Sequence, residues 1–294
     1  MQFDLMHLDT KTRSLAELSI AERIKIVYQP IWINYPAVSK LRNIILSIAA
    51  LPALTEAQCA LVTAESGMGK TSLFEKATQD LQRWGKKQGE GNPVLSITLG
   101  TETSPKDIIT AICAELGFDE LPIKKLKLNP SFIRLMKVRN IRFLLIDELH
   151  HLLLCNEKEQ RRSLVLLKRM IGSPLSISIL GFGIEEALHA VTIDQQLDRR
   201  FQKFSFSRWT ESEELRSFLA SYERAIPLKK PSFLASKEIV KFLTNNTICT
   251  TKAIAQRLSW GAIYALLDNE EFISLEHLRQ AAFFPDIMDV IGDE

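Results

Sequence analysis

The chain lacks the features that mark membrane, secreted or disordered proteins. No apolar stretch among its 294 residues reaches the roughly 18 residues that a membrane-spanning helix requires. The first residues include Asp4 and Asp9 and contain no continuous apolar segment, so we expect neither a secretion signal nor a membrane partner. Hydrophobic residues make up 46% of the chain and charged residues 24%, and this balance excludes extensive disorder.

Cysteine is scarce and shows no metal-binding spacing. The four cysteines never form a C-x-x-C pair and are scattered through apolar segments, at Cys59, Cys113, Cys155 and Cys249. This pattern is typical of buried thiols in a reducing cytoplasm and excludes a disulfide framework. His150 and His151 are adjacent, but successive side chains point in different directions and no matching Cys or carboxylate set is visible, so we do not expect a zinc site. We expect His150 to lie near Glu148 and His151 to be a packing or surface residue.

Acidic residues are missing from one long segment. The net charge is only +2, yet residues 121–146 contain no Asp or Glu. The basic residues that we expect to contact DNA phosphates lie here, at Lys124, Lys125, Lys127, Arg134, Lys137 and Arg139. Arg142 completes this run, and Arg161, Arg162, Lys168 and Arg169 form a second basic group farther along. For any single residue the alternative is a solvated helix face.

Residues 64–71, AESGMGKT, match the phosphate-binding loop pattern G-x-x-x-x-G-K-[ST] except that Ala64 replaces the first glycine. Gly67 and Gly69 allow backbone N–H groups to turn towards a phosphate, Lys70 would pair with the β- and γ-phosphates, and Thr71 would bind Mg²⁺. The apolar strand-like run at 59–64 and the helical spacing after the loop provide the expected context. The alternative is a loop that merely connects a strand to a helix. The predicted nucleotide-binding residues are Glu65, Ser66, Gly67, Met68, Gly69, Lys70, Thr71, Ser72 and Asp147.

A second motif lies about 75 residues farther along, where the apolar run Phe143 to Ile146 is followed by Asp147 and Glu148. Such a run is typical of a buried parallel strand. Asp147 is then placed to hold Mg²⁺ together with Thr71, and Glu148 to orient or deprotonate a water molecule. Taken alone, the two acids could also form a solvated turn. Joined to the phosphate-binding loop, they predict an ATPase that uses ATP and Mg²⁺.

Strand-like and helical patterns alternate through the first two thirds of the chain. We expect strands at 59–64, 93–100, 141–147 and 175–183, and helices at 104–118 and 157–171. No convincing strand follows Trp209, and the remaining patterns are helical. The sequence therefore predicts an α/β fold with a parallel sheet flanked by helices. We expect an N-terminal arm at 1–22, the nucleotide-binding domain at 23–208 and a helical lid at 209–294.

These motifs together resemble the AAA+ ATPases, which combine an α/β nucleotide domain with a small helical lid. Five segments in order are similar to the TniB/TnsC regulators of DNA transposition: WINYP at 32–36, ESGMGKT at 65–71, LLIDELHHLL at 144–153, ILGFGIEEAL at 179–188 and QLDRRFQKFSFSRW at 196–209. The likeness extends from about Arg23 to Ala282.

The resemblance implies a function that composition cannot show. Proteins of this family bind ATP, assemble on double-stranded DNA as rings or filaments, mark the target site, recruit or activate a DDE transposase, and receive targeting information from a TniQ-type protein. It implies a bacterial, cytoplasmic and DNA-associated protein. It also places Arg200 where an arginine finger would reach the nucleotide of a neighbouring subunit, with Arg199 as the other candidate. The alternative for Arg200 is an ordinary surface pair with an acid such as Asp198.

Two departures from the family pattern leave other functions open. The end of the 175–180 strand has Gly181, Phe182 and Gly183 where a polar water-positioning residue is usual, and no sensor arginine stands out in the lid, where Lys252 and Arg257 are the candidates. A nucleotide-binding DNA scaffold that scarcely hydrolyses ATP is therefore one alternative. A loader or initiator ATPase that acts on another DNA-bound protein is a second.

Overall fold

The computed structural model describes residues 4–52, 56–101, 103–118 and 130–291. The chain divides into two compact units. One is an α/β unit of residues 41–207, and the other is a helical unit that joins residues 1–40 to residues 208–294. Each is described by itself below.

The α/β unit contains a five-stranded sheet in the order β2-β3-β4-β1-β5, and every neighbouring pair is parallel. Its strands are β1 (Cys59–Ala64), β2 (Val94–Thr98), β3 (Phe143–Asp147), β4 (Ser178–Gly183) and β5 (Phe201–Phe206). All residues of β1, β3 and β4 are buried, as expected for the centre of a sheet that is covered on both faces. The predicted parallel α/β fold is confirmed.

The edge strand β5 was not predicted from the sequence. Only Phe201 among its six residues is buried, so the strand lacks the continuous apolar run that marks β1, β3 and β4. Its place is fixed by pairing along the whole length of β1, from Cys59 beside Phe201 to Ala64 beside Phe206. Pairing through the backbone places few constraints on side chains, so the sequence of an exposed edge strand does not show it.

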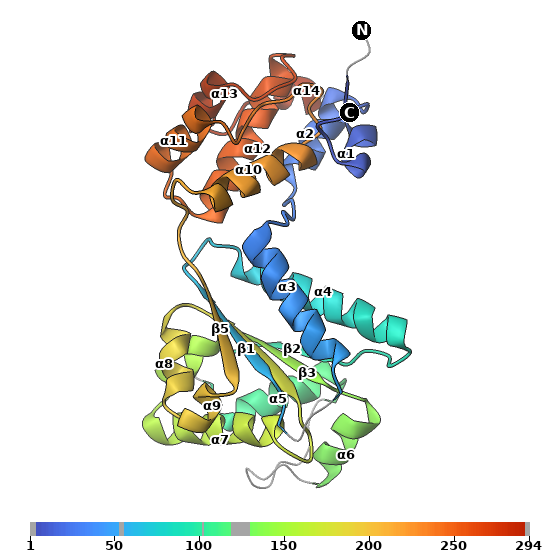
Figure 1. Ribbon diagram of the computed structural model, residues 1–294, viewed down its shortest axis with the longest axis vertical. Helices are drawn as coiled ribbons and strands as arrows, with labels where there is room; N and C mark the ends of the chain where they lie inside the picture. Colours follow the sequence, from blue (N-terminus) through green and yellow to red (C-terminus); the bar gives the residue numbers. More distant parts are fainter. Residues whose placement is uncertain (1–3, 53–55, 102, 119–129, 292–294) are drawn as a thin grey trace. The chain divides into compact units, whose positions relative to one another are not determined.

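Helices cover both faces of the sheet. Helix α4 (Lys70–Gln88) lies on one face, and α5 (Pro105–Glu115) and α7 (Glu157–Ile171) lie on the other (Figure 1). Helix α3 (Pro36–Ala50) crosses the division between the units. The other described helices of this unit are shorter, namely α6 (Pro130–Val138), the 3₁₀ helix η1 (Leu149–Leu154), α8 (Glu186–Thr192) and α9 (Gln195–Asp198).

Two of these helices begin at residues that the sequence marks as caps. Ser104 accepts a hydrogen bond from the backbone of Asp107, whose carboxylate accepts one in return from the backbone of Ser104, and Pro105 occupies the first helical position. Asn156 caps α7 by accepting from Glu159 N at 3.0 Å. Local sequence thus fixes where α5 and α7 start.

The helical unit contains eight described α-helices or parts of them. Besides the start of α3, they are α1 (Thr10–Leu15), α2 (Ile20–Tyr28), α10 (Glu213–Ala225), α11 (Lys237–Asn246), α12 (Thr251–Leu267), α13 (Leu275–Gln280) and α14 (Met288–Ile291). None of the described helices is both long enough and apolar enough to cross a membrane.

The described N-terminal residues do not form the separate arm that we expected. Leu8 and Ala16 are buried, Asp9 N donates to Arg224 O at 3.0 Å, and α1 follows directly. The segment at 23–40, which we expected in the nucleotide-binding domain, also packs in the helical unit. These contacts join residues distant in sequence, so the pattern of the first 40 residues could not reveal them.

A buried ion pair joins α2 to the C-terminal part of the helical unit. Arg23 donates to both carboxylate oxygens of Glu271 at 2.7 and 2.8 Å and to Pro227 O at 3.2 Å. The two side chains are only 2% and 8% exposed. Burial raises the pKa of Glu271, but the hydrogen bonds from Arg23 and from Lys229 N, with the charge of Arg23, outweigh it and lower the pKa. The carboxylate is therefore ionised in the folded chain.

We expect Arg23→Ala to lower the free energy of unfolding by about 3–5 kcal/mol in urea titrations, because it leaves the buried Glu271 charge unpaired. Because the folded pKa of Glu271 lies below its ordinary 4.5, the contribution of the pair is present above pH 4.5 and is lost as the pH falls through the folded pKa. Arg279→Ala, which removes an exposed pair with Glu276, is the control and should change stability by less than about 0.5 kcal/mol. Equal effects of the two variants would contradict the assignment.

Candidate functional site

The two sequence motifs come together at one edge of the sheet. Strand β1 ends at Ala64, where the phosphate-binding loop begins, and β3 ends at Asp147. Strand β4 lies between them and pairs with both. Since the strands are parallel, their carboxyl ends meet at the same edge, which is where open α/β sheets bind ligands. Residues about 80 positions apart in the sequence thus face one site.

The loop after β1 has the backbone shape that its glycines allow. Gly67 and Gly69 have φ angles of 80° and 87°, in the left-handed region that most side chains avoid. Met68 N donates to Glu65 O at 3.2 Å, which closes a turn, and Met68 is buried under it. Glu65 and Ser66 are exposed at the tip of the loop. The loop therefore exposes main chain to a ligand immediately before the N-terminus of α4.

Lys70 lies inside this loop. Its Nζ donates to Ala64 O at 2.8 Å and to Glu65 O at 3.3 Å. Thr71 and Ser72 follow in the first turn of α4, and both are exposed. A positive charge, a hydroxyl group and the positive end of a 19-residue helix are thus brought to one place.

Asp147 is a buried carboxylate at the opposite side of the site. It is 6% exposed, and its Oδ1 accepts a hydrogen bond from Glu148 N at 2.9 Å. Burial raises the pKa of Asp147, although the backbone hydrogen bond and the charge of Lys70 oppose this. Within the described residues it forms no ion pair with Lys or Arg, so no such pair neutralises this buried carboxylate.

Glu148 has a backbone conformation that the sequence did not predict. Its φ and ψ angles are 55° and 40°, a left-handed conformation that a residue with a long side chain rarely adopts. Strain of this kind costs roughly 1–3 kcal/mol and is concentrated at functional sites. The side chain is 35% exposed, and Oε2 lies 3.2 Å from His150 Nδ1.

The two adjacent histidines lie only partly as expected. Their ring centroids are 4.5 Å apart, and possible ligand atoms of Glu148, His150 and His151 all lie within 4.8 Å of one another. The tight 3₁₀ turn after Glu148 brings the side chains together, so the expectation that the two histidines point apart was wrong, whereas the expected position of His150 near Glu148 is confirmed. His151 Nδ1 is 2.8 Å from Leu99 O, in hydrogen-bonding position. The geometric objection to a metal ion at this cluster is therefore removed.

The candidate arginine fingers lie at the other end of the sheet. Arg200 immediately precedes β5, and its carbonyl accepts from Cys59 N, the first residue of β1. Its guanidinium pairs with Glu56, and not with Asp198, which pairs with Lys203. Arg199 is exposed. Since β1 is six residues long, Arg200 lies one strand length, about 16–20 Å, from the phosphate-binding loop of its own chain.

The predicted DNA contacts are only partly described. Lys124, Lys125 and Lys127 lie outside the described residues. Arg134, Lys137 and Arg139 are exposed on or just after α6, whose Phe132 and Met136 face the core. Arg142, by contrast, contacts Glu90, Leu51 O and the ring of Trp84. In the second basic group, Arg161, Arg162 and Lys168 pair with the acids Glu157, Glu159 and Asp194.

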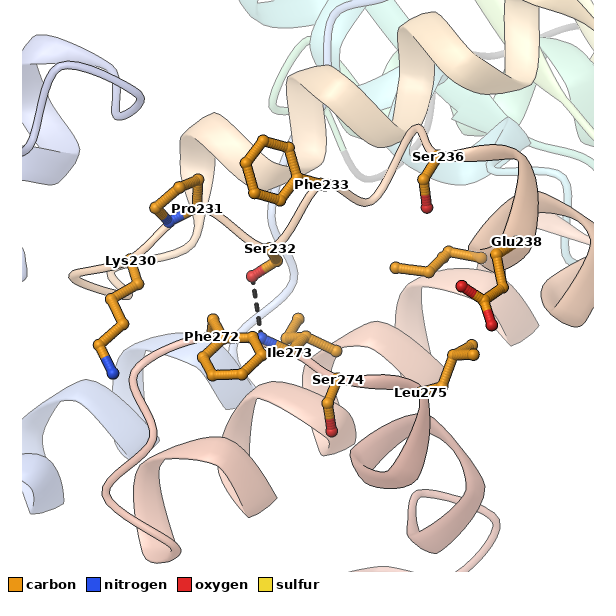
Figure 2. Close-up of a pocket in the computed structure, with 11 residues that line it drawn as sticks. Lys230, Pro231, Ser232, Phe233, Ser236, Glu238, Phe272, Ile273, Ser274 and Leu275 are labelled. Carbon is orange, nitrogen blue, oxygen red and sulfur yellow. Dashed lines mark hydrogen bonds between the residues drawn. The ribbon is translucent and has the colours of Figure 1, made fainter.

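A separate groove of about 460 Å³ lies in the helical unit. It is formed by residues 230–239 and 272–275, and Ile273 N donates to Ser232 Oγ at 2.9 Å within it (Figure 2). Phe233 lines it and is 69% exposed. The lining includes no residue of the phosphate-binding loop and only two charged side chains, Lys230 and Glu238. This groove is therefore distinct from the site at the edge of the sheet.

Comparison with solved structures shows which fold this arrangement belongs to. The chain is similar to the Aeropyrum pernix ORC2 protein in ADPNP–ADP complexes, with a TM-score of 0.60, 15% identity, and coverage of 87% of this chain and 70% of that one. A Drosophila ORC bound to DNA gives a TM-score of 0.60 at 15% identity, with coverage of 91% and 66%. Domain III of the Thermotoga maritima replication initiation protein DnaA gives 0.50 at 16%, with coverage of 87% and 95%. The fold is that of the AAA+ P-loop ATPases, as predicted.

Sequence comparison identifies the family. No curated protein matches this chain in sequence. The profile of the bacterial TniB protein, however, matches residues 23–211, which is more than half of the chain and includes both motifs of the site. The chain belongs to the TniB family.

Proposed function

We propose that this protein is an ATPase whose nucleotide site is the edge of the sheet where β1 and β3 end. The observation that carries the proposal is the meeting of Lys70, Asp147 and Glu148 across β4 in a chain of the TniB family. The loop from Glu65 to Ser72 would bind the phosphates through its backbone N–H groups, and Lys70 would exchange its contacts with Ala64 O and Glu65 O for phosphate oxygens. The Aeropyrum pernix ORC2 protein, which shares this fold, forms complexes with ADPNP and ADP, and this supports the assignment.

The donor set also fits Mg²⁺. The exposed hydroxyl of Thr71 and the buried carboxylate of Asp147 are the oxygen ligands that this ion prefers, and Asp147 forms no ion pair with a lysine or arginine in the described part of the chain. When bound there, Mg²⁺ would neutralise charge on the β- and γ-phosphates.

Glu148 is the proposed base for hydrolysis. Its carboxylate lies beside Asp147 but is more exposed, so it is free to accept a proton from a water molecule. The water oxygen would attack the γ-phosphorus, the bond to the bridging oxygen would break, and ADP would leave with the electron pair. The left-handed backbone at Glu148 supports this role because such strain is otherwise costly.

We further propose that hydrolysis requires a second copy of the chain. Arg200 lies one strand length from the loop of its own chain, so in this role it would reach only the nucleotide of a neighbour. A guanidinium supplied in this way stabilises charge that develops on the transferred phosphoryl group. ATP bound between subunits would hold a ring or filament together, and hydrolysis would loosen it. Arg199 is the other candidate.

We propose that this assembly forms on double-stranded DNA. The exposed residues Arg134, Lys137 and Arg139 of the acid-free segment supply positive charge and, within the described ranges, form no ion pair with an acid, unlike Arg161 and Arg162. The similar Drosophila ORC is bound to DNA, which favours the same class of ligand here. Lys124, Lys125 and Lys127 extend this proposal by sequence alone.

The proposed biological function is regulation of DNA transposition. Family membership supports a role in which the DNA-bound assembly marks the target, recruits or activates a DDE transposase and receives targeting information from a TniQ-type protein. Likeness in fold to ORC and DnaA favours a second candidate, a loader or initiator that acts on another DNA-bound protein. Lack of a polar side chain at Gly181 to Gly183 favours a third, a scaffold with little ATP turnover.

Variants of the two motifs test the proposed ATPase. We expect Lys70→Ala to abolish ATP binding, because it removes the positive charge beside the phosphates, and Glu148→Gln to bind ATP but lose more than about 100-fold in turnover. Binding would be measured by titration with a fluorescent nucleotide, and turnover by phosphate release with and without duplex DNA. Electron microscopy should show persistent assemblies on DNA for Glu148→Gln with ATP and none for Lys70→Ala. Wild-type particles that stay monomeric and ignore DNA would contradict the proposal.

A pair of variants at the ion pair of Arg200 tests the arginine finger. Arg200→Ala should lower DNA-stimulated turnover by about 1,000-fold, because the transition-state charge loses its partner. Glu56→Gln removes the same ion pair but keeps the guanidinium, so it should stay near wild-type turnover. Mixing Arg200→Ala with Lys70→Ala should restore part of the activity, since mixed interfaces combine an intact loop with an intact arginine. An equal loss of turnover in Arg200→Ala and Glu56→Gln would show that Arg200 acts only in folding.

The salt dependence of DNA binding tests the basic surface of α6. Replacing Arg134, Lys137 and Arg139 by alanine should weaken binding and reduce the slope of log K against log salt by up to about 2.7, at about 0.9 for each lost phosphate contact. The control is Arg161→Ala with Arg162→Ala, whose side chains already pair with acids. Fluorescence anisotropy with duplex DNA at several salt concentrations gives both slopes. An unchanged slope in the triple variant would exclude this surface.

A further inference from the structure

The end of β4 offers no polar side chain to the nucleotide site. Strand β4 lies between the strand of the phosphate-binding loop and the strand of Asp147, so its last residues face the reacting groups. Gly181 and Gly183 have no side chain, and Phe182 is fully buried against Phe74, with the ring centroids 5.5 Å apart. If ATP is hydrolysed here, another residue must position the water molecule or the base.

Gly181 makes space for the 3₁₀ helix η1, and Gly183 makes space for α8. A Cβ atom on Gly181 would lie 2.6 Å from Leu149 Cδ2, and one on Gly183 would lie 2.8 Å from Ala187 Cβ and 3.5 Å from His150 Nδ1. The first two distances are shorter than packing allows. The imidazole of His150 therefore lies against the position that a side chain at residue 183 would enter.

This place is central to the site. Gly183 pairs with Thr63, the residue before the phosphate-binding loop, and His150 Nδ1 lies 3.2 Å from Glu148 Oε2. The charges that act on the imidazole come from Glu148 and His151 beside it, from Lys70 on α4 and from Glu186 on α8. His150 thus lies between the proposed base and the start of the loop.

The nitrogen that faces Glu148 has no hydrogen bond. His150 Nδ1 is buried and, among the described residues, has no hydrogen-bond partner despite its closeness to Glu148 Oε2. Buried polar atoms are nearly always bonded, and exceptions are often found at catalytic groups. Burial also lowers the pKa of His150, which favours a neutral imidazole with one donor and one acceptor nitrogen. Such a ring can bond both a carboxylate and a water molecule.

We propose that His150 is a positioning residue for ATP hydrolysis, taking the place of the polar side chain that β4 lacks. A small rotation of the ring or of Glu148 makes the bond from Nδ1 to the carboxylate and directs its other oxygen towards the attacking water. Glu148 remains the base, and His150 acts through it. The inference rests on the ATPase function proposed above.

Steady-state kinetics of His150→Ala and His150→Asn with ATP and duplex DNA test this role. We expect kcat of His150→Ala to fall about 10- to 100-fold, the usual effect of removing an orienting partner, with KM and nucleotide affinity nearly unchanged. Asparagine keeps a donor and an acceptor, so His150→Asn should recover kcat to within a few-fold of wild type. His189→Ala, a histidine on α8, is the matched control and should leave kcat unchanged.

Three outcomes would overturn the proposal. The first is wild-type kcat in His150→Ala. The second is a loss that asparagine does not relieve and that follows a lower unfolding midpoint in urea, because packing alone would then explain it. The third is a wild-type protein that binds ATP but does not hydrolyse it with DNA, which supports the scaffold. Failure of the wild type to bind ATP at all would instead refute the nucleotide site itself.

Discussion

The parallel direction of the strands is the constraint on which the candidate site depends. Because β1, β3 and β4 run the same way, their carboxyl ends lie together and bring Lys70, Asp147 and Glu148 to one edge. Parallel pairing in turn needs long helical connections and a sheet buried on both faces, which explains the continuous apolar runs of the central strands. The fold and the position of the site thus have one physical origin.

Close packing at the same edge determines which side chains lie beside Glu148. Gly181 leaves space for Leu149 and Gly183 for Ala187, and the tight turn that carries Leu149 and His150 begins at Glu148 in a strained left-handed conformation. The lack of a polar side chain at the end of β4 thus occurs together with the position of His150 beside Glu148. Strand β4 lacks a polar sensor side chain, and the structure places His150 beside Glu148.

The helical unit depends on a different kind of interaction. Its N-terminal helices are joined to its C-terminal ones by the buried pair of Arg23 and Glu271 and by hydrogen bonds such as that from Ser259 Oγ to Val27 O at 2.9 Å. A buried charge pair contributes less to net stability than its Coulomb energy suggests, but it penalises any arrangement that leaves one partner alone. It therefore specifies which segments belong together.

The sequence by itself determined the α/β class, four of the five strands, the helix start at Ser104, and both motifs of the candidate nucleotide site. These features follow from local rules: apolar runs, capping side chains, and glycines before a lysine. Tertiary structure decided the rest, since β5, the burial of Leu8, Ala16 and Arg23, and the pairing of Arg200 with Glu56 depend on contacts across the fold. Such contacts depend on backbone pairing and on space left by small residues, and neither produces a periodic pattern of residue types in the sequence.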